Sequence, residues 1–161
     1  MRKVILVSIL LLVLSSITAC TLFDSAQSIR SGNAQSTDLD NIDIAGLRLG
    51  LNRTEIDLTQ FSPSIDVNSN FDIIFQDVRL KVDAVGDITY IHGVSVNING
   101  DVFDNVEQIK TALGEHFNGY WFDREQDMRA VTYTDRENNI TLTIVYSNTS
   151  NVFIWAILSM A

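Results

Sequence analysis

The 161-residue chain has one cysteine, one proline, two histidines and only 11 lysine and arginine residues against 20 aspartate and glutamate residues. A single cysteine cannot build a disulfide framework, and one cysteine with two histidines argues against a zinc site. The formal net charge of −9 argues against nucleic acid as a partner, because phosphate binding needs clustered cationic side chains. The catalytic motifs Gly-x-Ser-x-Gly and His-Glu-x-x-His and a phosphate-binding glycine loop are also missing. We therefore expect a protein that is not an enzyme and that needs no cofactor or metal.

What the sequence does have begins with a secretory signal peptide, predicted over residues 1–19. Two basic residues, Arg2 and Lys3, precede an apolar run over residues 4–14 and then a stretch of small residues. The run is shorter than the about 20 residues that a membrane-spanning helix needs. It also lacks the polar face that a helix at the surface of a folded domain turns to water.

The signal ends in Ile17-Thr18-Ala19-Cys20, which resembles the bacterial lipobox. That motif is an aliphatic residue and two small residues before an obligatory cysteine, and Ile17 stands here for the commoner leucine. The resemblance implies cleavage before Cys20, a diacylglycerol on its sulfur and often an acyl chain such as palmitate on its new amine. Because each buried CH₂ contributes about 0.8 kcal/mol, two or more chains would anchor the protein firmly in a membrane. We expect a lipoprotein of the bacterial cell envelope, held on the extracytoplasmic side of a membrane.

The rest of the chain divides by composition. Residues 20–41 are predicted to be the lipidated N-terminus and a flexible tether, because apolar residues are sparse after residue 24 and follow neither helix nor strand spacing. Residues 42–161 are predicted to form one α+β domain. We expect two related halves, 42–98 and 99–161, each a helix followed by an antiparallel strand meander, with the helices packed on one face of the sheet.

Both expected helices begin at a capping pair. Asn52 with Glu55, and Asp104 with Glu107, have the spacing that satisfies free backbone N–H groups at a helix start, and the two pairs are offset by 52 residues along the chain. The first helix is expected to stop near Pro63. The second is expected to have an apolar face and a glycine cap, made by Val106, Ile109, Leu113 and Gly114.

Alternation of apolar and polar residues predicts the strands of both halves. The expected strands cover residues 71–75, 78–82, 88–98, 128–134, 140–146 and 152–158. In the strand over 88–98, every second side chain is expected on one apolar face: Ile88, Tyr90, His92, Val94, Val96 and Ile98. This position favours a buried structural role for His92 over a catalytic one.

The segment Leu49-Gly50-Leu51-Asn52-Arg53-Thr54-Glu55 resembles a short motif, aliphatic-Gly-hydrophobic-Ser/Asn-x-x-Glu, of the fold shared by BamE-type outer-membrane lipoproteins and the β-lactamase inhibitor protein. A second copy matches only over residues 103–107, where Gly100-Asp101 stands in place of the Leu-Gly. The resemblance covers about residues 42–160. It implies a helix-backed antiparallel sheet that binds protein, and it transfers neither a partner nor a site residue.

Aromatic residues give the candidate binding site. Tyr120, Trp121 and Phe122 either fill the core or form an exposed anchor, since such rings offer a large contact area at low entropic cost. The last predicted strand is apolar on both faces, so its second face is either covered or exposed as an interaction surface with Phe153 and Trp155. We expect a non-enzymatic protein-binding or assembly module that uses these five residues. The alternative is a small-ligand or lipid-binding domain with a pocket between helices and sheet.

Overall fold

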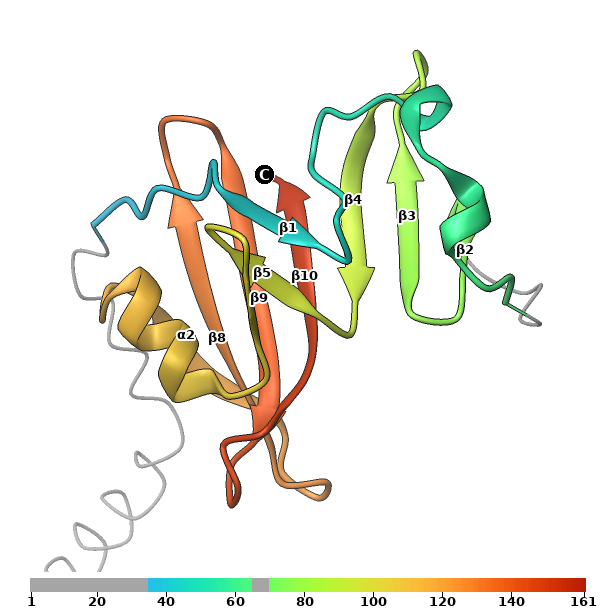
Figure 1. Ribbon diagram of the computed structural model, residues 1–161. Coiled ribbons are helices and arrows are strands. Elements are labelled where there is room, and N and C mark those ends of the chain that lie inside the picture. Colours follow the sequence, from blue (N-terminus) through green and yellow to red (C-terminus); the bar gives the residue numbers. More distant parts are fainter. Residues whose placement is uncertain (1–34, 65–69) are drawn as a thin grey trace, which may run out of the picture. The chain divides into compact units, whose positions relative to one another are not determined.

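The computed structural model describes residues 35–64 and 70–161, which fold into two antiparallel sheets with one α-helix (Figure 1). The smaller sheet has the order β1-β5-β6. Its strands are β1 (Ile42–Ile44), β5 (Val96–Ile98) and β6 (Asp101–Phe103). The larger sheet has the order β2-β3-β4-β10-β9-β8-β7. Its strands are β2 (Ile73–Ile74), β3 (Val78–Val82), β4 (Ile88–Gly93), β7 (Asn118–Asp123), β8 (Met128–Asp135), β9 (Ile140–Ser147) and β10 (Phe153–Met160).

This mainly β architecture shows that the expected α+β fold of two helix-and-meander halves is wrong. In the first half, the helical segments among residues 42–64 and 70–98 are two short 3-10 helices, η1 (Arg53–Glu55) and η2 (Leu58–Gln60). The predicted capping box is present, because the Asn52 side chain accepts from the Thr54 N–H and Glu55 accepts from the Asn52 N–H. A cap starts a turn, but burial of an apolar face continues a helix, and no residue of η1 or η2 is buried.

The second half has the expected helix, α2 (Val106–Leu113). Asn105, not Asp104, is its N-cap, and it accepts a hydrogen bond from the Glu107 N–H at 2.9 Å. Val106 and Ile109 are buried, as the apolar spacing predicts, and the helix ends at Gly114 with a positive φ of 86°. The helix is fixed to the large sheet by the Tyr133 hydroxyl, which donates to the Gly114 carbonyl at 3.1 Å.

The strand expected over residues 88–98 is divided between the two sheets. Its first part, β4, contains one extra residue opposite β3, because the pairing changes from Lys81↔Tyr90 to Val82↔Ile88. Ile88 and Ile91 are therefore buried on one face, whereas Tyr90 and His92 lie on the other. The expectation that all these side chains share one apolar face is wrong from the bulge onward, and His92 does not belong to the core.

Both halves of the chain contribute to one continuous large sheet, through the pairing of β4 with β10. Gly93 lies opposite Ala156 and Ile91 opposite Leu158 in this register. The two halves are thus joined edge to edge by backbone hydrogen bonds. They are not two similar units that bury their faces against each other.

The ordered domain begins before Ile42. Residues 35–41, expected to belong to the tether, run along the end of β8, where the Thr37 N–H donates to the Thr134 carbonyl at 2.9 Å. Leu39 is 2% exposed, and its N–H donates to the Asp135 carboxylate. The signal peptide, Cys20 and the first part of the expected tether lie outside the described residues. In the part of the chain that the structure describes, no helix is long and apolar enough to cross a membrane.

The core lies between the large sheet and a second layer made of the small sheet and α2 (Figure 1). We call the covered side of the large sheet the inner face. Its buried side chains include Val78, Leu80, Ile88, Ile91, Val131, Tyr133, Leu142, Ile144, Ala156 and Leu158. Contact with the small sheet is close at Gly93, where an added Cβ would collide with the Cγ2 atom of Ile44 in β1. Glycine here lets the two layers approach.

Candidate protein-binding face

The opposite side of the large sheet, the outer face, has a distinct composition. Strand register places on it the side chains of Ile74, Arg79, Lys81, Tyr90, His92, Asn118, Tyr120, Asp123, Met128, Ala130, Thr132, Thr134, Thr141, Thr143, Val145, Ser147, Trp155, Ile157 and Ser159. The set combines aromatic rings, hydroxyl groups and two cations. Thr132 bonds to Thr143 and Thr141 bonds to Ser159, each with the oxygens 2.9 Å apart, so the hydroxyls are tied across the strands. In the figure, α2 and the small sheet cover the inner face only (Figure 1).

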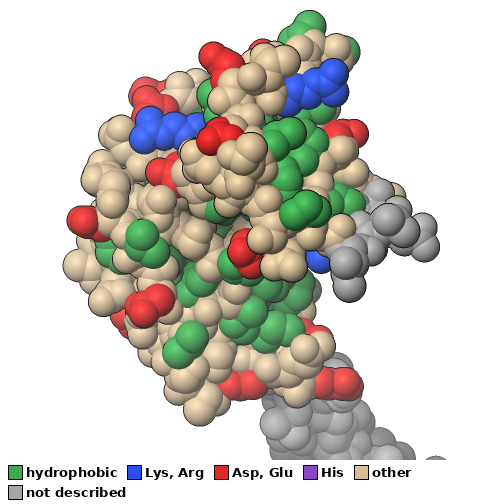
Figure 2. Space-filling model, turned by 45° about the vertical axis from the view of Figure 1, so that its right-hand side comes forward, with side chains coloured by type: hydrophobic (Ala, Val, Ile, Leu, Met, Phe, Trp, Pro, Cys, Tyr) green, Lys and Arg blue, Asp and Glu red, His purple; other side chains and the backbone are tan. Residues whose placement is uncertain are grey.

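Among the described residues, the carboxylates on the side of the outer face lie at strand ends, although the chain has 20 acidic residues: Asp77 lines a cleft beside Arg79, and Asp123 lies opposite Met128 at the end of β7. The nearest acidic residues along the chain, such as Asp72, Asp87 and Asp123, lie at strand ends and turns. Acidic side chains are spread widely over the side of the molecule drawn in Figure 2. Acidic residues are thus missing from the central strand positions of the described outer face, which is the face that the second layer does not cover.

An aromatic row crosses the outer face, and we define it as Phe71, Tyr90, His92, Trp155 and Phe122. The Phe71 ring lies 5.7 Å from Tyr90 and 6.3 Å from His92, measured between ring centroids. Trp155 stands edge-to-face between His92 and Phe122, with both centroid distances 5.0 Å and interplanar angles of 85° and 84°. Such contacts add about 0.5–1.5 kcal/mol per pair beyond burial, so the rings hold one another in place.

Two bulges lie beside the aromatic row, one in β10 and one in β7. In β10 the pairing changes from Phe153↔Tyr146 to Trp155↔Val145, so the two aromatic side chains of this strand do not share a face. Phe153 packs against the core, and Trp155 lies on the outer face. In β7 the extra residue is Phe122, which lies between the pairs Trp121↔Arg129 and Asp123↔Met128 and reaches Trp155.

The five aromatic residues predicted as a binding site therefore separate into two groups. Tyr120, Phe122 and Trp155 meet on the outer face. Trp121 lies on the opposite side of β7, 38% exposed, with the Arg129 guanidinium 5.2 Å and the Arg124 guanidinium 5.4 Å from its ring centroid. Phe153 is partly buried against the core.

Two small residues lie between the rings of Trp155 and Tyr120 on the sheet surface. They are Val145 and Ala130, and the four residues follow one another across four neighbouring strands. Ala130 and Val145 are 0% exposed, although no second layer of the described residues covers this face. Tyr120 and Phe122 remain 43% and 48% exposed. The rings of Tyr120 and Phe122 thus lie on the sheet and remain partly exposed to solvent.

The two cations of the outer face lie against the same rings. The Arg79 guanidinium is 5.8 Å from the Phe71 centroid, and the Lys81 ammonium is 5.8 Å from Phe71 and 5.3 Å from Tyr90. Neither has a carboxylate within ion-pair distance, since the described residues contain a single ion pair, Lys110 with Glu107. Ring contacts therefore hold both cations in place, and no carboxylate of the described residues forms an ion pair with either of them.

A cleft of about 110 Å³ lies beside the centre of the row. Its wall includes Asp77, Arg79, His92, Val94 and Trp155. Burial, with the Arg79 charge as a second cause, lowers the pKa of His92 below its ordinary value of 6.5. The imidazole is therefore neutral at pH 7 and packs as an aromatic ring between Phe71 and Trp155.

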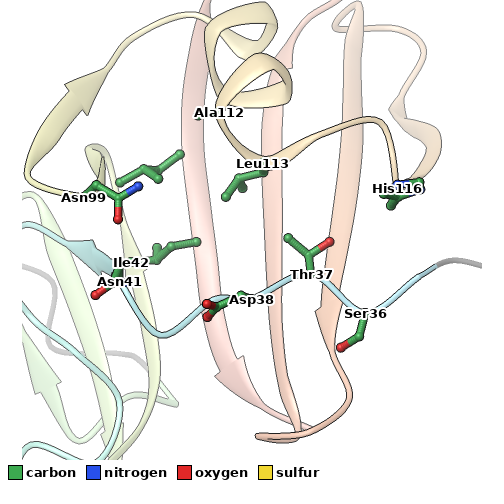
Figure 3. A pocket seen from close by; sticks show the side chains of 10 residues that line it. Ser36, Thr37, Asp38, Asn41, Ile42, Asn99, Ala112, Leu113 and His116 are labelled. Carbon is green, nitrogen blue, oxygen red and sulfur yellow. The ribbon is translucent and has the colours of Figure 1, made fainter.

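A second cavity, of about 300 Å³, lies between α2 and the segment over residues 36–42 (Figure 3). Its lining is mainly polar, from Ser36, Thr37, Asp38, Asn41, Asn99 and His116, with Ile42, Ile98, Ala112 and Leu113 as apolar members. Figure 3 shows Thr37 and Leu113 extending toward each other from the segment and from the end of the helix. The Thr37 hydroxyl is buried without a hydrogen-bond partner.

A group of three carboxylates, from Asp38, Asp40 and Asp135, lies close to this cavity, with one oxygen from each within 4.8 Å of the others. The buried member, Asp135, already has four donors. Its Oδ1 accepts from the Glu137 and Asn138 N–H groups, and its Oδ2 accepts from the Leu39 N–H and the Asn138 amide. Burial acts to raise the pKa of Asp135, but these hydrogen bonds outweigh it and hold the pKa below its usual value. These hydrogen bonds explain why the carboxylates lie together: Asp135 holds residues 35–41 against the end of β8 through the Leu39 N–H.

No family model, curated protein or solved structure matches the chain.

Sequence reasoning missed five members of the outer-face site: Phe71, Arg79, Lys81, Tyr90 and His92, the last of which it placed in the core. A signal for two of them is present in the sequence, because Arg79 and Lys81 are the polar positions of a clearly alternating strand. Their nearness to Trp155 depends on the pairing of β3, β4 and β10, which alternation within one strand does not reveal.

Proposed function

We propose that this protein is a lipid-anchored envelope lipoprotein whose domain binds a protein partner through the outer face. The observation that carries the proposal is the aromatic row, which is held by mutual ring contacts and is yet partly exposed on a face whose carboxylates lie only at strand ends. Interfaces are enriched in aromatic residues and arginine and depleted of acidic residues. Well-supported tryptophan and tyrosine side chains are also the usual energetic centres of interfaces.

The lipid anchor is the second part of the proposal and rests on the sequence around Cys20. Attachment there would keep the domain at a membrane surface and raise its effective concentration toward partners on the same membrane. Replacing Cys20 with alanine is expected to leave an unprocessed precursor that incorporates no labelled fatty acid. Normal processing of Cys20→Ala would contradict the anchor.

Partner binding is tested by chemical crosslinking and pull-down of the membrane-anchored protein from its native cells. Trp155→Ala and Phe122→Ala are expected to lose a stoichiometric protein that the wild type captures. Val102→Ala is the matched control, because Val102 is 70% exposed and lies in the small sheet, away from the outer face. All variants should keep the wild-type circular dichroism, and equal capture by all of them would contradict the proposal.

A small-ligand carrier is the second candidate, and the cavity of about 300 Å³ beside α2 favours it. Its mainly polar lining suits a small hydrophilic molecule rather than an acyl chain. The test is mass spectrometry of the protein isolated from its cells. A co-purifying small molecule that Thr37→Val fails to retain would support this function, and a protein isolated without one would count against it.

A further inference from the structure

We propose that the partner segment that binds the outer face is acidic, with carboxylates directed at Arg79 and Lys81 and an apolar side chain beside Trp155. This inference rests on the proposed function and specifies the chemistry of the partner. It does not follow from the aromatic row alone, which would fit an uncharged partner equally well.

The first argument is the distribution of charge. The chain carries a net charge of −9, so an acidic partner is repelled by most of its surface. The outer face differs, because two cations without ion-pair partners among the described residues lie within its strands and its carboxylates, Asp77 and Asp123, lie at strand ends. An acidic segment is therefore favoured along β3, and the acids elsewhere on the surface disfavour other orientations.

The second argument is the state of the two cations. Arg79 is half-buried and Lys81 is exposed, and each lies over an aromatic ring without a carboxylate partner. A partner carboxylate would meet side chains that are already positioned, so less conformational entropy is lost on binding than with freely moving chains. The guanidinium of Arg79 can also accept a carboxylate in the bidentate geometry that strengthens such pairs.

The third argument is the cleft of about 110 Å³ between Arg79 and Trp155. Val94 and Trp155 supply apolar walls, while Asp77 lies on its lining and would repel a carboxylate placed inside. The cleft therefore suits an uncharged apolar side chain, and the carboxylates of the partner are expected to bind along β3 instead. This arrangement predicts alternating acidic and apolar residues in the partner segment.

Two other anionic partners, a lipid surface and a nucleic acid, fit the face less well. Both present dense phosphate charge, and binding to them depends on clusters of several basic residues. Only two cations lie on the outer face, and they stand beside an extended aromatic row. A polypeptide segment with a few carboxylates and several apolar side chains matches a face that has two cations beside an aromatic row.

The test uses the full-length processed protein in neutral detergent with a defined probe, the random copolymer of glutamate and tyrosine. Trp121 and Trp155 are the only tryptophans, so Trp121→Phe leaves Trp155 as a fluorescent reporter on the outer face. We expect saturable binding of the copolymer with a change in Trp155 emission. The affinity should fall by about fivefold or more in Arg79→Glu/Lys81→Glu, because two attractive charge contacts become repulsive. It should also fall as salt is raised from 0.05 to about 0.5 M.

The matched control is Arg48→Glu/Arg53→Glu, which changes the net charge by the same amount through two residues that do not belong to the strands of the outer face. An equal loss of affinity in the control would contradict the inference, since net charge alone would then explain binding. Failure of the copolymer to change Trp155 emission would also contradict it, as would a larger response to anionic vesicles or to single-stranded DNA. A partner captured through Trp155 whose binding is insensitive to Arg79→Glu/Lys81→Glu would overturn this inference and leave the proposed function standing.

Discussion

The two faces of the large sheet are built from the same strands but from different residues. The inner face is aliphatic and buried under the small sheet and α2, with Leu80, Leu142 and Ile144 all 0% exposed. The outer face presents aromatic rings, threonines and two cations to solvent. A sheet that needed only solubility would carry mixed charges on its open side. The outer face instead keeps apolar rings, and its carboxylates lie at strand ends, which is the arrangement that the proposed recognition role requires.

A bulge contributes to this difference. Without the extra residue in β10, Phe153 would share the outer face with Trp155. The bulge turns Phe153 toward the core without ending the strand. Strand irregularity thus decides which aromatic side chain of β10 joins the aromatic row and which joins the core.

The largest effect is expected from shortening one side chain on each face of the large sheet and comparing the two losses of stability. Leu142→Ala on the inner face should lower the free energy of unfolding by about 2–5 kcal/mol, because it leaves a cavity in the packed core. Ile157→Ala on the outer face should cost about 1 kcal/mol, since that residue is only half-buried. Urea denaturation measures both. Equal costs would mean that the outer face is packed like a core, and the comparison would fail.

A second prediction concerns the contact between the large sheet and the small one. Gly93→Ala should destabilise the fold by about 1–3 kcal/mol, because the new methyl group meets Ile44 and lies 3.2 Å from the Asp77 carbonyl oxygen. Combining it with Ile44→Ala should cost less than the sum of the single changes, since the clash is removed. Additive costs would show that Ile44 does not limit the approach of the two layers.

The smallest expected effect is the pH dependence contributed by His92. Its pKa is lower in the folded protein than the ordinary value of 6.5, so the unfolded chain takes up the proton first as the pH falls. The contribution of His92 to stability is therefore complete above pH 6.5 and declines as the pH drops below that value. His92→Gln should remove this decline, measured by denaturation between pH 7.5 and 5, with His116→Gln as a control variant. An unchanged pH profile in His92→Gln would contradict the burial of this ring in the aromatic row.

The sequence predicts well what depends on neighbouring residues. Alternation locates β3, β8, β9 and β10, and the apolar spacing of Val106 and Ile109 with Gly114 locates α2. The expected first helix fails for a physical reason, because a capping box at Asn52 is a local signal whereas helix continuation depends on tertiary burial. The clamp of residues 35–41 onto Asp135 is also invisible locally, since its partners are about one hundred residues apart.

The candidate site shows the same limit. Tyr120, Phe122 and Trp155 could be chosen from the sequence as exposed or buried anchors, but the choice between those roles depends on strand pairing. Phe153 and Trp155 have the spacing of a shared face, and a single bulge separates them. The contributions of Phe71 and Tyr90 depend on β4 lying next to β10, a contact that follows from the order of the strands in the sheet.

The central claim, that the outer face binds a protein partner, is tested most directly by site-specific photocrosslinking in living cells. A photoreactive amino acid is placed at Thr143, near the middle of the outer face, and in a second strain at Val102 in the small sheet. The account predicts one discrete protein adduct at position 143, abolished by Trp155→Ala, and none at position 102. Adducts at position 102 with none at 143 would contradict it and would place the binding surface on the other side of the molecule.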